Sequence, residues 1–150
     1  KSAIEDYRKM IIPLATIITP NREESKILSG YSSVMDAARK IQQLGAKNVI
    51  ITGSNESKKM IEDFVLESKN DYILKGEKIN ITNHGSGCNY SASIASSLAL
   101  KRSIHDAAQY AKEYVFQSIK NSRNLGKGIN IAYKKISQMK DELKSYKSTF

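Results

Sequence analysis

Asn83-His84-Gly85-Ser86-Gly87-Cys88-Asn89-Tyr90-Ser91-Ala92 is the stretch around which the rest of the chain is expected to fold. A short apolar run with Ile79 and Ile81 leads into it, and a run of small residues, expected to form a helix over residues 86–100, leads out. A Gly-Ser-Gly turn that opens a helix presents unpaired backbone N–H groups at the positive end of the helix dipole. The sequence therefore predicts an anion site here, and phosphate is the usual anion.

Cys88 directly follows the two glycines and is the only cysteine of the chain. A helix N-terminus favours the thiolate form of a thiol in its first turn, so Cys88 can serve as a nucleophile or base beside a phosphate. The alternative is that the turn is only a turn and that Cys88 is a small buried apolar residue. From spacing alone both interpretations stay open, because Gly-x-Gly before a helix is a weak motif.

Two motifs resemble one family of kinases. The first, His84-Gly85-Ser86-Gly87-Cys88 followed by Ser91-Ala92-Ser93-Ile94-Ala95, resembles the signature near the C-terminus of the ribokinase-like (PfkB) kinases. Most members have Asp as the catalytic base at the cysteine position. Cysteine there resembles the hydroxymethylpyrimidine/phosphomethylpyrimidine kinases of thiamin biosynthesis. The second, Pro13-Leu14-Ala15-Thr16-Ile17-Ile18-Thr19-Pro20-Asn21-Arg22-Glu23-Glu24-Ser25, is similar to that family's Pro-Leu-Ala-Thr…Thr-Pro-Asn-x-x-Glu-Ala element.

The resemblance runs from about residue 12 to about residue 128. It implies an α/β layered ribokinase-like fold, with a partly parallel sheet flanked by helices. The resembled kinase domain is nearly twice this long, so residues 1–128 are expected to be its C-terminal, nucleotide-binding part. Residues 129–150 lie beyond the match and are expected to form a helical tail or linker, because their apolar residues recur at helical spacing.

The N-terminal third has the rhythm of a βαβ unit. Residues 1–12 are expected to end a helix that Pro13 stops, and residues 14–19 to form a buried parallel strand. Residues 23–28 are expected to form a short helix with Gly30 as its C-cap. A helix capped by Ser32 or Ser33 and ended by Gly45 follows, and it leads to a second parallel strand over residues 47–53.

The middle of the chain is predicted to form a hairpin. Residues 60–66 and 71–79 alternate like strands, and Ser68-Lys69-Asn70 is a turn sequence. A helix over residues 57–67 stays open as an alternative, because the apolar residues there also fit a period of 3.6. The last predicted helix covers residues 104–122, with Ser103 as its cap.

Asn21 and Glu24 follow the first predicted strand, at the end where open α/β sheets bind ligands. The resemblance makes them the family's Asn-x-x-Glu element, which helps to hold Mg²⁺ largely through water. The residues alone favour another interpretation, in which Asn21 caps the helix and Glu24 merely suits its first turn. Thr52 and Gly53 end the second strand, where the family usually has Lys-Gly-Gly-His near the nucleotide phosphates. Thr52 can donate a hydroxyl to a phosphate but lacks the charge of the lysine.

The resemblance implies ATP-dependent phosphorylation of hydroxymethylpyrimidine and/or its phosphate, with ATP and Mg²⁺. Cys88 would be the base, and the N–H groups of Gly85, Ser86, Gly87 and Cys88 the anion hole. Ile79 and Ile81 would flank the adenine. The first half of the family's domain supplies most of the pyrimidine pocket, so this chain alone is expected to be inactive. The alternatives are a pyridoxal-type kinase of the same superfamily and a non-catalytic nucleotide-binding or regulatory remnant.

Charge and composition bear on partners and location. The net charge is +9, and residues 101–150 carry 11 basic and 4 acidic side chains. A solvated helix surface explains this excess better than a nucleic-acid site, because no aromatic residues interleave with the charges. No apolar run approaches the roughly 18 residues of a membrane span, and no signal peptide is visible. The expectation is a cytoplasmic protein whose partners are a small pyrimidine, ATP and the first half of the kinase domain, with self-association left open.

Overall fold

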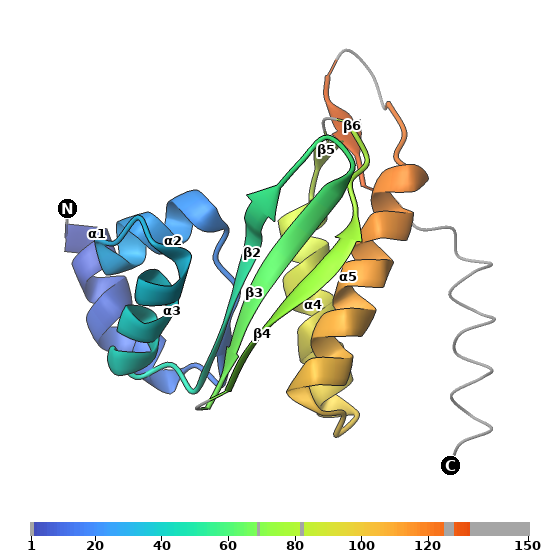
Figure 1. The fold of residues 1–150 in the computed structure, drawn as a ribbon. Helices are drawn as coiled ribbons and strands as arrows, with labels where there is room; N and C mark the ends of the chain where they lie inside the picture. The colour runs from blue at the N-terminus through green and yellow to red at the C-terminus, as the bar shows by residue number, and fades with distance from the viewer. Residues whose placement is uncertain (1, 69, 82, 125–127, 133–150) are drawn as a thin grey trace. The chain divides into compact units, whose positions relative to one another are not determined.

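The computed structural model describes residues 2–68, 70–81, 83–124 and 128–132 (Figure 1). By its internal contacts the chain divides into two compact units, residues 1–78 and residues 79–150. Each unit carries part of the predicted site, and each is described by itself.

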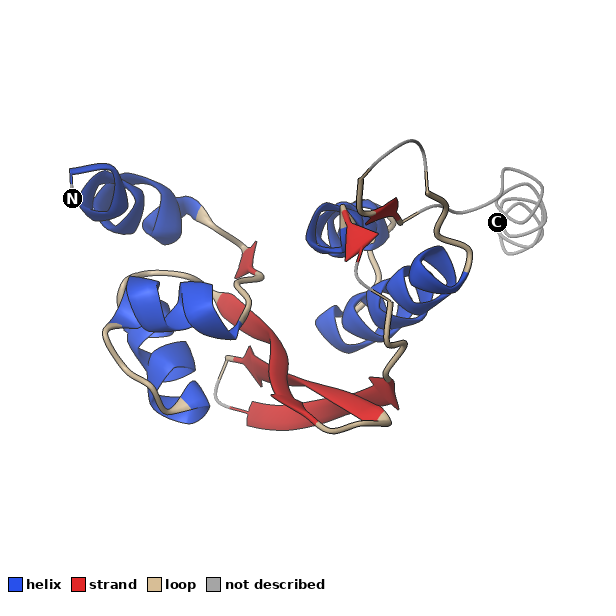
Figure 2. Cartoon of the chain, turned by 90° about the horizontal axis from the view of Figure 1, so that it is seen from above, coloured by secondary structure: helices blue, strands red, loops and turns tan. Residues whose placement is uncertain are grey.

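The first unit contains a four-stranded sheet in the order β1-β2-β3-β4 (Figure 2). Its strands are β1 (Ile17–Ile18), β2 (Asn48–Glu56), β3 (Met60–Glu67) and β4 (Asn70–Glu77). β1 pairs with β2 in parallel, and β2, β3 and β4 pair antiparallel. The sheet is therefore partly parallel, as predicted. The predicted hairpin is confirmed, and the helical alternative for residues 57–67 is wrong.

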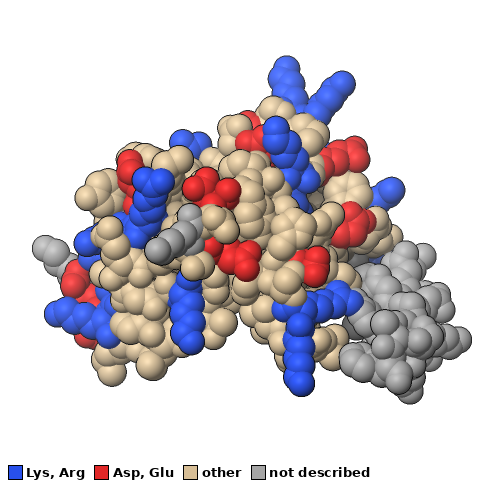
Figure 3. Space-filling view, turned by 60° about the horizontal axis from the view of Figure 1, so that its bottom comes forward, with Lys and Arg blue, Asp and Glu red and all other residues tan. Residues whose placement is uncertain are grey.

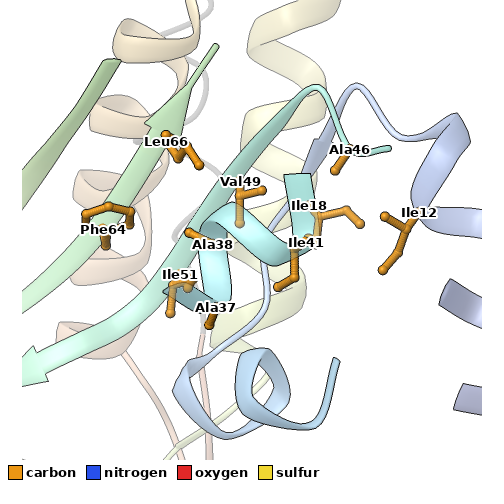
Figure 4. Close-up of a cluster of buried hydrophobic side chains, with 10 residues drawn as sticks. All are labelled: Ile12, Ile18, Ala37, Ala38, Ile41, Ala46, Val49, Ile51, Phe64 and Leu66. Atoms are coloured by element: carbon orange, nitrogen blue, oxygen red, sulfur yellow. The ribbon is translucent and has the colours of Figure 1, made fainter. Parts of the chain in front are cut away.

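Two capped helices cover one face of this sheet. α2 (Arg22–Ser29) ends at Gly30, whose φ is +83°. α3 (Val34–Gln43) begins after Ser33, whose hydroxyl accepts a hydrogen bond from the Asp36 N–H at 3.3 Å. Figure 4 shows the apolar cluster between α3 and the sheet, where alternate residues of β2 share one face. Its members are Ile12, Ile18, Ala37, Ala38, Ile41, Ala46, Val49, Ile51, Phe64 and Leu66.

The N-terminal segment differs from the prediction. α1 (Ser2–Asp6) continues as a π-helical turn, η1 (Tyr7–Ile11), and then as a 3-10 turn, η2 (Ile12–Leu14). Pro13 does not stop the helical path, because it occupies the first positions of the 3-10 turn, where a missing N–H costs nothing. The strand predicted over residues 14–19 shrinks to Ile17–Ile18, and Leu14 is 83% exposed.

The second unit is built on two packed helices, α4 (Ser86–Ala99) and α5 (Ile104–Lys120). The residues buried on them are mostly small, so the two helices can approach closely. They are Tyr90, Ser93, Ile94 and Ser97 on α4, and Ala107, Ala108, Ala111 and Ser118 on α5. Two short strands, β5 (Asn83–His84) and β6 (Asn130–Ile131), pair in parallel beside them.

The start of the predicted helical tail is wrong, because residues 130–131 form the strand β6. Residues 130–131 are extended because they pair with β5, which a prediction from helical spacing cannot detect. Residues 133–150 lie outside the described residues, so the rest of the predicted tail and the boundary at residue 128 stay predictions. In the described part of the chain, no helix has the length and apolar character needed to cross a membrane.

Candidate functional site

The glycine turn before α4 has the predicted form. Gly85 is the N-cap of α4, with φ +92° and ψ −3°, and its carbonyl accepts the first helical hydrogen bond, from Asn89 N–H at 3.0 Å. Among the described residues, no side chain caps this N-terminus. The N–H groups of Ser86, Gly87 and Cys88 therefore form the donor-rich end of a 14-residue helix. This geometry suits an anion, and the anion hole stays a prediction.

Cys88 lies in the first turn of α4 with an exposed, free thiol. The alternative in which it is a small buried core residue is wrong, because the Cys88 side chain is exposed. A thiol at this place is accessible to a bound molecule, as a base or nucleophile must be.

Backbone pairing with β6, which the sequence did not reveal, fixes His84 directly before this turn. β6 pairs with β5, and Ala132 N–H donates to the His84 carbonyl at 3.0 Å. Arg123 and Ile131 exchange two further backbone hydrogen bonds at 3.2 and 3.0 Å. Two-residue strands carry no periodic signal, so sequence reasoning missed them.

Ile79 and Ile81 lie outside any strand, because β4 ends at Glu77. Ile81 N–H donates to the Ile79 carbonyl at 2.9 Å, which makes a tight turn, and Ile81 is 38% exposed. The strand predicted to reach residue 79 is therefore too long. Contact of these two side chains with adenine stays a prediction.

In the first unit, Asn21 follows β1 and lies beside Thr52, which is inside β2. The prediction that Thr52 and Gly53 end the second strand is wrong, because β2 continues to Glu56 in its pairing with β3. Asn21 and Thr52 form a parallel bridge, and Thr52 N–H donates to the Pro20 carbonyl at 2.9 Å. The Thr52 hydroxyl lies 3.5 Å from the same carbonyl. Asn21, Glu24 and Thr52 thus lie together where β1 ends, and ligands of open α/β folds bind beyond the carboxyl ends of parallel strands.

Asn21 and Glu24 form a capping box at the start of α2. Glu24 N–H donates to Asn21 Oδ1, and Asn21 N–H donates to Glu24 Oε2, both at 2.9 Å. The capping interpretation of these residues is therefore confirmed. Both side chains are exposed, and each oxygen has a second lone pair for water. In the described part of the chain no three His, Cys, Asp or Glu side chains cluster as metal ligands. The role of Asn21 and Glu24 toward Mg²⁺ stays a prediction.

Gly53 adopts φ +60°, a left-handed conformation. Its N–H donates to Oδ1 of Asp63 at 3.0 Å, so this N–H is already engaged. Asp63 is 3% exposed, and sequence reasoning missed it. The available signal was a single carboxylate directly before the apolar run Phe64-Val65-Leu66.

A groove of about 450 Å³ opens on the first unit beside Glu24. Its wall is largely apolar: Ala3, Ile4, Tyr7, Ile18, Thr19, Pro20, Glu24, Ile27 and Leu28. Three of these apolar side chains are exposed: Ile4 and Tyr7 to 40% and Ile27 to 54%.

The partly parallel sheet with capped helices, followed by a glycine turn that opens a helix, is the arrangement of the ribokinase-like fold. The structure of an ADP complex of Bacillus subtilis pyridoxal kinase superposes with a TM-score of 0.82 at 32% identity, covering 92% of this chain and 57% of that one. The chain belongs to the phosphomethylpyrimidine kinase family, whose pattern matches residues 1–132. Both results confirm the resemblance stated from the two motifs.

Individual relatives agree with the family. The chain is 32% identical over 138 residues to the hydroxymethylpyrimidine/phosphomethylpyrimidine kinase of Haemophilus influenzae, covering 85% of this chain and 51% of that protein. It is 34% identical over 137 residues to the enzyme of the same name from Aquifex aeolicus, covering 87% and 54%. The chain thus spans about half the length of the curated relatives that it matches.

Proposed function

We propose that this chain is the nucleotide-binding half of a hydroxymethylpyrimidine/phosphomethylpyrimidine kinase, an ATP-dependent phosphotransferase of thiamin biosynthesis. One observation carries the proposal. The N-terminus of α4 has no side-chain cap among the described residues, Gly85 stands there at φ +92°, and the exposed thiol of Cys88 lies in the first turn. Family membership supplies the reaction class. Since the reaction consumes ATP, we place it in the cytoplasm.

Phosphoryl transfer depends mainly on positioning and on stabilising charge. The substrate hydroxyl would give its proton to Cys88 as its oxygen attacks the γ-phosphorus, and the bond from that phosphorus to the bridging oxygen of ADP would break. The N–H groups of Ser86, Gly87 and Cys88 would donate to the phosphate oxygens on which charge develops. Mg²⁺, held through water by Asn21 and Glu24, would neutralise further phosphate charge.

The apolar groove on the first unit is an argument for one partner of this chain, the first half of the kinase domain. The relatives are about twice as long as this chain, so their domain contains a further half. β1 is an edge strand that pairs only with β2 among the described strands, and the apolar groove of Ile4, Tyr7 and Ile27 lies beside it. Strands added to β1 would extend the sheet, and their connecting segments would cover these side chains.

The charge of the described residues gives no support to a nucleic-acid partner. On the face shown in Figure 3, acidic side chains lie between the basic ones. Of the basic side chains between residues 101 and 150, five lie in the described part, together with two acidic ones. A tract that binds phosphate backbones would need a more continuous row of positive charge.

Reconstitution tests the proposal. The chain would be co-expressed with the N-terminal half of the Aquifex aeolicus relative, and ADP release would be measured with hydroxymethylpyrimidine. We expect turnover by the pair and none by the chain alone, and we expect Cys88→Ala to lower the rate by about 10²–10⁴-fold, as loss of a general base does. Turnover with pyridoxal but not with the pyrimidine would favour the pyridoxal-type alternative, to which the 32% identity with Bacillus subtilis pyridoxal kinase points. Nucleotide binding without any turnover would favour the non-catalytic remnant.

A further inference from the structure

Asp63 stands opposite an irregularity in the central hairpin. β2 and β3 pair regularly up to Ile51 and Phe64, and pairing resumes at Asn55 and Glu62. Residues 52–54 of β2 therefore face Asp63 alone, which makes a bulge within β2.

The side chain of Asp63 provides the acceptor that the bulge needs. Gly53 N–H donates to Asp63 Oδ1 at 3.0 Å, and the Ser54 hydroxyl donates to the Glu62 carbonyl at 3.1 Å. A Cβ at Gly53 would have Ile61 Cδ1 as its nearest neighbour, at 3.9 Å. Space is therefore not the reason for glycine. The reason for glycine is its φ of +60°, a left-handed conformation that other residues adopt only with a loss of stability.

Burial at this position is unfavourable for the free energy of a carboxylate. Phe64, Val65 and Leu66, which follow it, are all at most 5% exposed, and Asp63 itself is 3% exposed. Burying a carboxylate is unfavourable unless hydrogen bonds compensate it. An apolar side chain would suit the strand but would leave Gly53 N–H without this acceptor, so the bond to Gly53 is one interaction that compensates the buried carboxylate.

We propose that Asp63 is a positioning residue for the nucleotide phosphates. By accepting a hydrogen bond from Gly53 N–H, Asp63 fixes the left-handed turn that follows Thr52 and so the place of Thr52 beside Asn21. The Thr52 hydroxyl, which donates to the Pro20 carbonyl at 3.5 Å, would turn to a phosphate oxygen when ATP binds. Gly53 acts through its conformation, since its N–H is occupied by Asp63. This inference rests on the proposed function, because it presumes that ATP phosphates reach Thr52.

The test compares Asp63→Asn, which keeps an oxygen acceptor, with Asp63→Val, which suits a strand but removes the acceptor. ATP and adenosine would be titrated into each ¹⁵N-labelled chain by NMR. We expect Asp63→Val to weaken ATP binding by about tenfold, the loss that one hydrogen-bonded group typically causes. Asp63→Asn should stay within about threefold of the wild type, and adenosine, which lacks phosphates, should bind all three chains equally.

Equal loss of ATP and adenosine affinity in Asp63→Val would mean a general structural role and would overturn the proposal, as would unchanged ATP affinity. If Asp63→Val does not fold, exchange of the Gly53 amide proton in the wild type decides: slow exchange supports the bond to Asp63, and exchange at the rate of a solvated amide refutes it. Failure of the wild type to bind ATP, with a protected Gly53 amide, would instead overturn the proposed function, and this role of Asp63 would fall with it.

Discussion

The two glycines of the α4 turn are expected to respond to alanine in opposite ways, although neither has a neighbour within 4 Å of an added Cβ. Gly85 has φ +92°, so Gly85→Ala forces a side chain into the left-handed region at about 1–2 kcal/mol. The stiffer unfolded chain offsets about 0.4–1 kcal/mol of that cost. Gly87 is helical, and Gly87→Ala should stabilise by about 0.5–1 kcal/mol because alanine loses less entropy in a helix.

Urea unfolding followed by circular dichroism measures both changes, provided that the slope with urea stays constant across the variants. Because each alanine meets open space, packing cannot produce the contrast, and the backbone conformation alone must do so. The two variants should differ by about 1.5 kcal/mol, with the wild type between them. Equal stabilities, or a more stable Gly85→Ala, would refute the left-handed cap at Gly85 and with it the anion turn.

Three further predictions test other parts of the structure. Asn21→Ala should destabilise the chain by about 1 kcal/mol while Asn21→Asp, which still caps α2, should not; equal melting temperatures would contradict the capping box. The hydrogen bond from Ser103 is the main cause that holds the pKa of Asp106 below its ordinary 3.8, so Ser103→Ala should raise that pKa in an NMR titration. The lowered pKa stabilises the fold above pH 3.8, and this contribution is lost as the pH falls through the folded-state pKa; an unshifted titration would contradict the hydrogen bond. Gly45→Ala should cost roughly 2 kcal/mol or more in urea unfolding, because φ is +119° and the new Cβ would lie 2.7 Å from Pro13 Cα; a wild-type midpoint would contradict this packing.

Local signals in the sequence predicted much of the fold. Ser33 and Ser103 cap α3 and α5 as expected, because a cap depends on a few neighbouring residues. The hairpin was predictable from alternation and the turn at residues 68–70. The βαβ rhythm predicted the parallel pairing of β1 with β2. The family resemblance added the ribokinase-like fold and the reaction class, which local signals lack.

Features that depend on distant residues could not be predicted. The run at residues 14–19 has the composition of a buried strand, yet only Ile17–Ile18 pair with β2. Leu14 still belongs to the 3-10 turn η2, and Pro20, which follows the run, has no N–H to donate. The pairing of β6 with β5 joins segments more than forty residues apart. The Asp63 bond to Gly53 crosses a bulge whose position no periodicity marks. For the site, the sequence indicated Cys88 and the glycine turn, but not that Gly53 N–H is already engaged.

Calorimetric binding of Mg-ATP to the chain, beside Cys88→Ala and Gly87→Val, tests the central claim most directly. We expect weak binding by the wild type, little change in Cys88→Ala and none detectable in Gly87→Val, whose branched side chain would occupy the phosphate turn. Since a Cβ at Gly87 meets nothing within 4 Å in the absence of ligand, that variant should still fold, and a cooperative melt would verify it. Binding by Gly87→Val equal to that of the wild type would contradict the assignment of the α4 turn as the phosphate site.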